Sequence, residues 1–195
     1  MYQDASKVLT VSKDYTARVW ESSTGECTHS LQGHQDSVIG AAVDEKTNRI
    51  ATCALDNTVR VWNASSGELI SMLELDGKIS LVALSERDVA VAMDNGNIAI
   101  APINLPEEVH CIKVHKSTIT GLRFLGGGKY LASCSMEGTV KVFDTVQGTL
   151  QGVFIGDCGI SCFECDEVTH NIIAGTDRGV VYFIDTSVLL ENRER

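Results

Sequence analysis

The sequence predicts an all-β protein built from repeated units of about 40 residues. One stretch, Asp14–Glu26, is repeated almost in full as Asp56–Glu68, and a weaker copy begins at Glu137. The segments between turns are short and rich in Val, Ile, Thr and Ala. They mostly alternate between apolar and polar residues, which is typical of half-buried strands. The chain has only two prolines and no helical stripe of apolar residues. These observations indicate small antiparallel sheets repeated along the chain.

Turn residues such as Ser, Thr, Asn, Asp and Gly divide the chain into the predicted strands. The first two units hold strands at residues 7–12, 16–20, 27–31, 38–43, 49–54, 58–62 and 69–73. The next two hold strands at residues 79–84, 89–93, 97–101, 109–114, 119–124, 130–135, 139–143 and 149–155. The last holds strands at residues 160–165, 171–175 and 180–184, with 188–190 as a candidate outer strand before a charged end.

Alignment of the units on Trp20, Trp62 and Phe143 gives four strands per unit. The units run over residues 1–31, 32–73, 74–114, 115–155 and 156–195, within a single predicted domain. A small sheet of this kind cannot bury both faces alone, so the sheets must stack against one another. Radial stacking of such sheets is the β-propeller architecture. Because the first unit lacks its innermost strand, we expect about four full blades plus a partial first blade, in an incomplete ring.

Polar residues recur at fixed positions within the units. The second unit has Gly33-His34, Thr52, Asp56 and Trp62, the first has Thr10, Asp14 and Trp20, and the fourth has His115, Ser133, Glu137 and Phe143. In these residues the chain resembles the WD-repeat family of propellers. The resemblance implies that the side chains hydrogen-bond one another within each blade, since buried polar groups need mutual partners. It covers essentially the whole chain, most closely in the first two units.

Three units depart from the family pattern. In the fourth, Phe143 has no N–H and Glu137 is one methylene longer than Asp, so we expect this network to be broken. The third and fifth units have no polar set: the corresponding residues are Val91, Asn95 and Ala101, and Ala174, Arg178 and Ile184. Those two blades are expected to depend on apolar packing. The packing residues are Ile79, Val82 and Leu84 in one, and Ile160, Phe163 and Cys165 in the other.

A catalytic interpretation of the polar set is also open, because His34, Thr52 and Asp56 supply a base, a hydroxyl and an orienting acid. A catalytic set occurs once per site, whereas this one recurs at the structural period, which favours a structural role. Gly126–Lys129 does not have the spacing of a phosphate-binding loop and is predicted to be a hairpin turn. The sequence therefore predicts no catalytic or cofactor-binding residues.

A cluster of cysteines invites a metal-site interpretation. Cys158, Cys162 and Cys165, with His170 nearby, offer ligand types that zinc or an iron–sulfur cluster would accept. Strand alternation, however, places Cys162 and Cys165 on opposite faces of one strand. We therefore favour an apolar packing role for these residues and predict no metal site.

The formal net charge of −10 argues against nucleic acid as a partner, because phosphate binding needs a basic stripe. No apolar run reaches the roughly 18 residues that a membrane span needs, and the first residues do not resemble a secretory signal. The seven cysteines are odd in number and lack a disulfide-framework spacing, which favours reduced thiols. We expect an intracellular, cytoplasmic protein with no membrane partner.

The family resemblance implies a non-catalytic scaffold that docks other proteins or peptides through its loops. The candidate loops and turns are residues 32–37, 76–78, 115–117, 156–159, 13–15, 55–57 and 136–138. The acidic charge favours basic partners. A second hypothesis makes the chain the sensor propeller of a larger signalling ATPase, and a third, less favoured, is a propeller-scaffold enzyme. Because family members most often have seven blades, we expect a fragment of a longer protein, whose open blade ends allow self-association.

Overall fold

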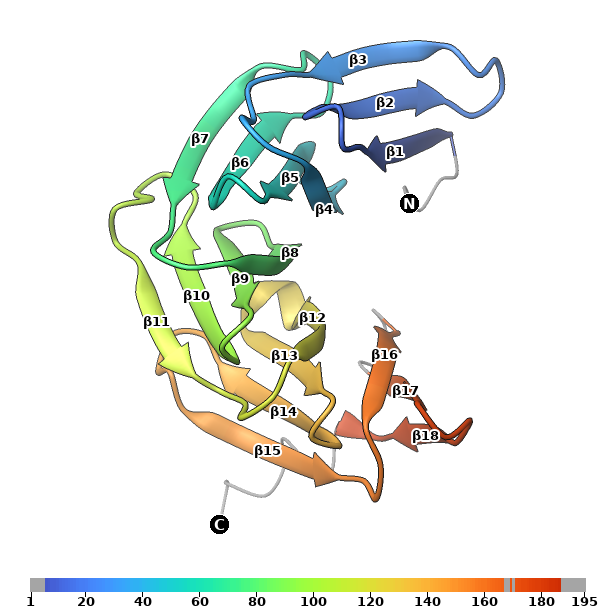
Figure 1. Ribbon diagram of the computed structural model, residues 1–195, viewed down its shortest axis with the longest axis vertical. Coiled ribbons are helices and arrows are strands. Elements are labelled where there is room, and N and C mark those ends of the chain that lie inside the picture. Colours follow the sequence, from blue (N-terminus) through green and yellow to red (C-terminus); the bar gives the residue numbers. More distant parts are fainter. Residues whose placement is uncertain (1–5, 167–168, 170, 187–195) are drawn as a thin grey trace. The chain divides into compact units, whose positions relative to one another are not determined.

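The computed structural model describes residues 6–166, 169 and 171–186, which form five consecutive antiparallel sheets (Figure 1). Every strand predicted within the described residues is present, and its ends lie within one residue of the predicted ends. The candidate strand at 188–190 lies outside the described residues. Local bonds explain the small shifts. Thr16, for example, belongs to a turn because its N–H and hydroxyl both donate to Asp14 Oδ1, at 3.0 and 2.6 Å.

The first two sheets follow the chain in simple up-and-down order. The first contains β1 (Lys7–Val11), β2 (Ala17–Glu21) and β3 (Cys27–Leu31). The second contains β4 (Val38–Asp44), β5 (Arg49–Ala54), β6 (Thr58–Asn63) and β7 (Leu69–Glu74).

The remaining sheets have the same connectivity. The third contains β8 (Ile79–Leu84), β9 (Asp88–Met93), β10 (Asn97–Pro102) and β11 (His110–Lys113). The fourth contains β12 (Ile119–Leu125), β13 (Tyr130–Ser135), β14 (Thr139–Asp144) and β15 (Leu150–Ile155). The fifth contains β16 (Ile160–Cys165), β17 (Ile172–Thr176) and β18 (Val181–Ile184). The Gly126–Gly128 hairpin turn between β12 and β13 takes the form of a short 3-10 helix, η1.

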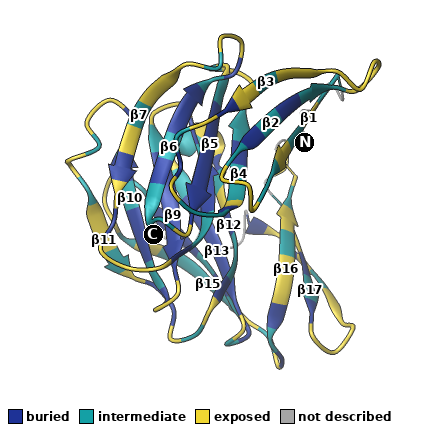
Figure 2. Ribbon diagram, turned by 45° about the horizontal axis from the view of Figure 1, so that its top comes forward, coloured by how far each residue is buried: buried dark blue, intermediate teal, exposed yellow. Residues whose placement is uncertain are grey.

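The chain divides into two compact units, residues 1–91 with 99–110, and residues 92–98 with 111–195. Central strands are the best buried. β5 is dark blue over most of its length in Figure 2, whereas β16 is largely yellow and teal. The prediction that residues 1–195 form a single domain stays a prediction.

Two kinds of sheet face alternate through these units. We call the face that carries the Trp-position residue (Trp20, Trp62, Ala101, Phe143 or Ile184) the Trp face, and the opposite face the Val face. In the first of the two compact units, Ala17 and Val19 on the Val face of the first sheet pack against Ile50 and Trp62 on the Trp face of the second sheet.

The other described interfaces have the same polarity. The Val face of the second sheet, with Val59 and Val61, packs against Val91 and Ala101 of the third. In the second unit, Val140 and Val142 of the fourth sheet pack against Ala174 and Ile184 of the fifth. Each of these interfaces therefore joins the Val face of one sheet to the Trp face of the next.

Candidate functional site

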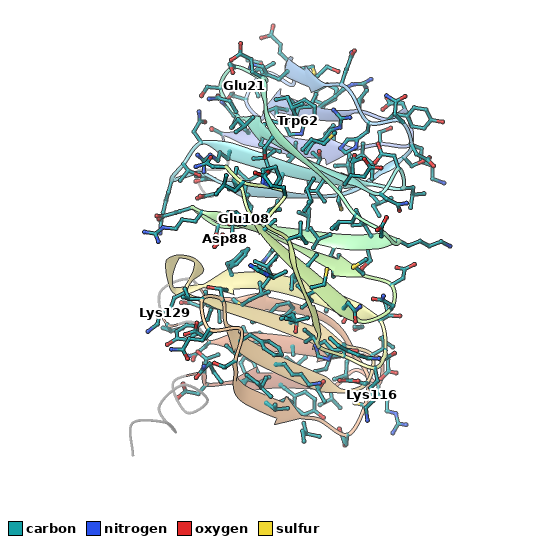
Figure 3. The ribbon with its side chains drawn as sticks, turned by 90° about the vertical axis from the view of Figure 1, so that its left-hand side faces the viewer. Glu21, Trp62, Asp88, Glu108, Lys116 and Lys129 are labelled. Atoms are coloured by element: carbon teal, nitrogen blue, oxygen red, sulfur yellow. The ribbon has the colours of Figure 1, made fainter. Side chains whose placement is uncertain are left out.

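The polar residues of the second sheet form one continuous hydrogen-bonded network. Trp62 Nε1 donates to Thr52 Oγ1 at 2.9 Å, and Thr52 Oγ1 lies 2.8 Å from His34 Nε2. His34 Nδ1 lies 3.1 Å from Asp56 Oδ2. These contacts are mutually consistent when the Thr52 hydroxyl donates to Nε2 and Nδ1–H donates to Asp56. His34, Thr52 and Trp62, which is labelled in Figure 3, are buried.

Asp56 also joins two loops. Its Oδ2 accepts the backbone N–H of Gln35 at 2.7 Å, and its Oδ1 accepts the N–H and hydroxyl of Thr58 at 2.9 and 2.7 Å. Burial would raise the pKa of Asp56, but these hydrogen bonds outweigh it and hold the pKa below the usual value. Burial lowers the pKa of His34, against the opposing influence of Asp56. The network therefore holds a neutral imidazole next to a charged carboxylate.

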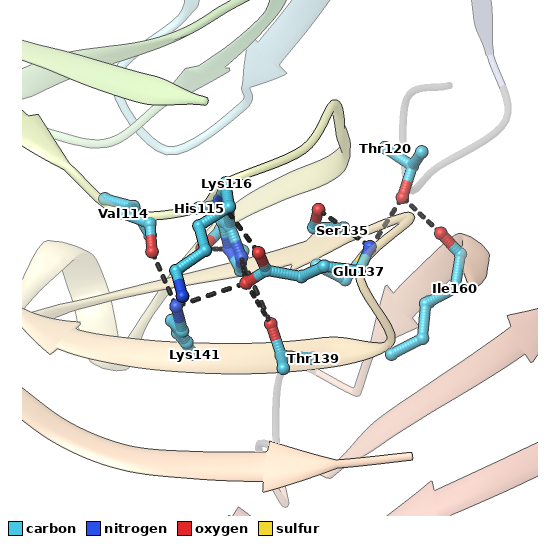
Figure 4. A network of polar contacts seen from close by, with 11 residues as sticks. Val114, His115, Lys116, Thr120, Ser135, Glu137, Thr139, Lys141 and Ile160 are labelled. Carbon is cyan, nitrogen blue, oxygen red and sulfur yellow. Dashed lines mark hydrogen bonds and ion pairs between the residues drawn. The ribbon is translucent and has the colours of Figure 1, made fainter. Parts of the chain in front are cut away.

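The fourth sheet contains a matching network, which corrects the expectation that it is broken (Figure 4). His115 Nε2 lies 2.8 Å from Ser133 Oγ, and Nδ1 lies 2.8 Å from Glu137 Oε1. Glu137 also accepts the N–H of Lys116 at 2.8 Å, as Asp56 accepts that of Gln35. Only the indole donor is missing, because Phe143 fills the Trp position. The extra methylene of Glu137 is accommodated without loss of either contact.

The charge state of this second network follows from the same contacts. Burial would raise the pKa of Glu137, but hydrogen bonds from Lys116, His115, Thr139 and Lys141 lower it to about 2. Burial lowers the pKa of His115, which is 1% exposed. Both networks thus have the same protonation state near neutral pH.

The first sheet contains only part of this arrangement among its described residues. Trp20 Nε1 donates to Thr10 Oγ1 at 2.8 Å, so these two predicted residues are brought together. Asp14 accepts hydrogen bonds within its own turn, from Thr16 and from Arg18 Nη2 at 2.9 Å. The structure shows no hydrogen bond that connects Asp14 to the Thr10–Trp20 pair among the described residues.

Among the described residues, the third and fifth sheets show no such network, as their sequences imply. Val91, Ala101, Ala174 and Ile184 are all buried. Asn95, in the acid position of the third sheet, accepts the N–H of Asn97 at 3.0 Å and so retains only the bond that shapes the turn.

A basic residue four positions after each acid was missed by sequence reasoning. Lys141 Nζ donates to the carbonyl of Val114 at 2.6 Å and to Glu137 at 3.2 Å. Arg60 occupies the same position in the second sheet, and its Nε is buried with no hydrogen-bond partner among the described residues. The signal was present in the alignment, because Arg18, Arg60 and Lys141 occupy equivalent positions in the three polar repeats.

The position of the Arg60 side chain also explains why residue 33 is a glycine. Gly33 has a φ of 143°, and a Cβ added there would lie 2.6 Å from Arg60 Nη1. Glycine at this position therefore permits both the turn and the close approach of the guanidinium group.

Exposed apolar side chains lie on the turns next to these networks. In the first compact unit they are Tyr15 and Leu55, with exposures of 47 and 50%, and Ile39 at the start of β4 is 37% exposed. Backbone bonds connect their segments: Val38 N donates to Ser12 O at 3.1 Å, and Leu55 N donates to Ser37 O at 2.9 Å. The braced turns thus hold apolar side chains in solvent at defined positions.

The second unit repeats this feature at the β13–β14 turn. Met136, in the position equivalent to Leu55, is 40% exposed, and its N–H donates to Thr118 O at 3.1 Å.

The catalytic and metal-binding alternatives receive little chemical support from the geometry. Thr52 is fully buried and bonded on both sides, so its hydroxyl has no open side for a substrate. Burial raises the pKa of Cys165 to about 12, which disfavours a thiolate. Cys158 is buried and Cys162 is exposed, while His170 lies outside the described residues. Within the described ranges, no three His, Cys, Asp or Glu side chains are grouped as metal ligands would be. The described part also contains no helix long and apolar enough to cross a membrane.

Five consecutive antiparallel sheets, with a His–hydroxyl–acid network in two of them, are the sheet architecture of an incomplete β-propeller. A family model described as "WD domain, G-beta repeat" matches residues 25–63 and 106–144, the segments that contain the two His–hydroxyl–acid networks. These two segments are therefore WD repeats. A comparison with curated proteins found no match.

Among solved structures, the chain is similar to the computationally designed Ika8 protein, whose crystal structure it matches with a TM-score of 0.78. The two sequences are 24% identical, so this likeness concerns the fold alone. The match covers 95% of this chain and 57% of the designed chain. The present chain thus spans a little over half the length of that protein.

Proposed function

We propose that this chain is a non-catalytic scaffold that binds other proteins or peptides through hydrogen-bonded turns that carry exposed apolar side chains. WD repeats are typical of protein-interaction scaffolds in general. One observation carries the finer proposal: Tyr15 and Leu55 are about half exposed on turns whose backbones are fixed by hydrogen bonds. A turn whose backbone is already fixed loses little backbone entropy when a partner covers it, which favours binding.

The charge of the chain indicates what kind of partner would fit. Its 26 acidic residues exceed its 16 basic ones, and Asp14 and Asp36 lie close in sequence to Tyr15 and Ile39. Long-range attraction would steer basic partners to such a surface, while the apolar side chains would supply affinity. We therefore propose a peptide segment with Lys or Arg next to apolar residues as the ligand.

Selection from a displayed random-peptide library, followed by fluorescence titration of the enriched peptides, tests this proposal. We expect the enriched peptides to combine basic and apolar residues. Leu55→Glu should weaken their binding by roughly tenfold or more, because a centrally placed apolar contact commonly supplies that much. Tyr15→Ala should act in the same direction.

Val146→Glu is the matched control, since Val146 is 90% exposed and lies on the β14–β15 turn. It introduces the same charge and should leave peptide binding unchanged. Peptides that bind Leu55→Glu, Tyr15→Ala and Val146→Glu as tightly as the unmodified chain would contradict the proposal. A library that yields no enriched basic sequence would also contradict it.

A further inference from the structure

The fifth sheet presents an apolar face to solvent. Ile173 is directly opposite Phe183 in the pairing of β17 with β18, and Val181 is two residues before Phe183 on the same face. Their exposures are 47, 79 and 54%. These residues form the Val face of the fifth sheet, which we call the tail face.

The first sheet presents a face of the opposite kind. Val8 pairs with Trp20 and Thr10 with Arg18, so these four residues share the Trp face of the first sheet, which we call the head face. Val8 is 39% exposed, and Trp20 is half-buried with its indole donating to Thr10. The buried residues Ala17 and Val19 lie on the opposite face, against the second sheet.

The chain itself shows what covers each kind of face. The Trp62 face of the second sheet, with the same Trp-to-Thr hydrogen bond as the head face, lies under Ala17 and Val19. Val181 and Phe183 occupy the positions in the fifth sheet that Ala17 and Val19 occupy in the first. A tail face therefore has the alternation and the apolar side chains needed to cover a head face.

We propose that the head face of one copy of this chain binds the tail face of a second copy, as successive sheets bind within one chain. Contacts between two different faces are heterologous, so the association continues into larger ring or linear assemblies instead of stopping at a symmetric dimer. This interface uses residues other than Tyr15 and Leu55, so it can be tested separately from the proposed peptide-binding turns.

Sedimentation of the 195-residue chain over about two decades of concentration tests the proposal. We expect the average mass to rise with concentration above the 21.0 kDa of one copy. Phe183→Glu and Val8→Glu should each shift the population toward monomer at a given concentration, because each places a charge in the interface. Both side chains are exposed, so the changes should leave the fold intact, and circular dichroism checks this. Val146→Glu, with the same charge on an exposed turn, should associate like the unmodified chain.

A mixing experiment then separates specific pairing from general aggregation. Phe183→Glu retains its head face and Val8→Glu retains its tail face, so an equimolar mixture should form a heterodimer that cannot grow further. A chain that stays monomeric at every concentration would overturn the proposal. So would association that both end-face variants retain, that Val146→Glu also abolishes, or that fails to return as a heterodimer on mixing.

Discussion

His34 and His115 are neutral, buried side chains, and this makes the stability of the molecule sensitive to acid. Burial holds the pKa of each below the ordinary value of 6.5. As the pH falls below 6.5, the unfolded chain takes up protons that the native chain does not, so the free energy of unfolding decreases. The pKa of Glu137 is lowered from 4.5 to about 2. The free energy of unfolding therefore decreases further as the pH falls from about 4.5 to about 2.

We therefore predict that urea unfolding, measured at constant protein concentration, shows stability falling in two ranges as the pH decreases from 7 to 2. Glu137→Gln should reduce the part between about 4.5 and 2, because it removes one carboxylate of lowered pKa while Asp56 still contributes. A stability that rises on acidification through 6.5 would show that the histidines are charged in the native state.

Asp56 and Asp14 occupy the same position in two repeats but have different surroundings. Asp56 accepts bonds from His34, Gln35 and Thr58, whereas the exposed Asp14 accepts bonds from Thr16 of its own turn and Arg18 of β2. We predict that Asp56→Ala lowers the free energy of unfolding by about 1–3 kcal/mol, because it unpairs a buried imidazole. Asp14→Ala, the matched control, should cost clearly less. Equal losses in urea titrations of the two variants would show that burial of the network does not matter.

At the scale of whole strands, Gly121 fixes how closely the fourth and fifth sheets approach. It lies at a register shift in β12, and a Cβ added there would lie 2.1 Å from Phe163 Cδ1 of β16. We predict that Gly121→Ala costs about 1–3 kcal/mol through overpacking.

Gly175→Ala is the control for that variant, since its Cβ would approach only the exposed sulfur of Cys162. Its effect on the unfolding midpoint should be smaller. If both variants unfold at the same midpoint as the unmodified chain, the packing between β12 and β16 is looser than the structure indicates.

The strands were predictable from sequence because alternation and turn residues are local signals, and each strand in the described residues obeys them. The network of the second sheet was also predictable, from the spacing of His34, Thr52 and Asp56. The intact network of the fourth sheet was not, because residue type alone does not show that the longer Glu137 reaches both His115 and Lys116. The exposure of the tail face was likewise not predictable. It depends on which sheets pack against each other, and strand patterns do not specify this tertiary property.

At the scale of the whole molecule, the net charge of −10 acts against association of identical copies. Two like-charged chains repel each other, and added salt screens that repulsion over about 10 Å at 0.1 M. We predict that the concentration needed for half-association, measured by sedimentation, decreases as sodium chloride is raised. An increase with salt would show instead that ion pairs dominate the contact.

The lack of a polar network in the fifth sheet has a consequence for protein engineering. Arg178 takes the acid position there and is exposed, and a Cβ at Gly179 would meet no atom within 4 Å. The β17–β18 turn is therefore free of the carboxylate that ties the equivalent turns of the second and fourth sheets to their preceding loops. One backbone bond, from Asp177 N to Gly159 O at 3.0 Å, still joins this turn to its preceding loop, but its exposed tip after Asp177 is of the kind where chains accept inserted sequence. This turn is accordingly a suitable position for grafting an epitope or a reporter peptide without disturbing either histidine.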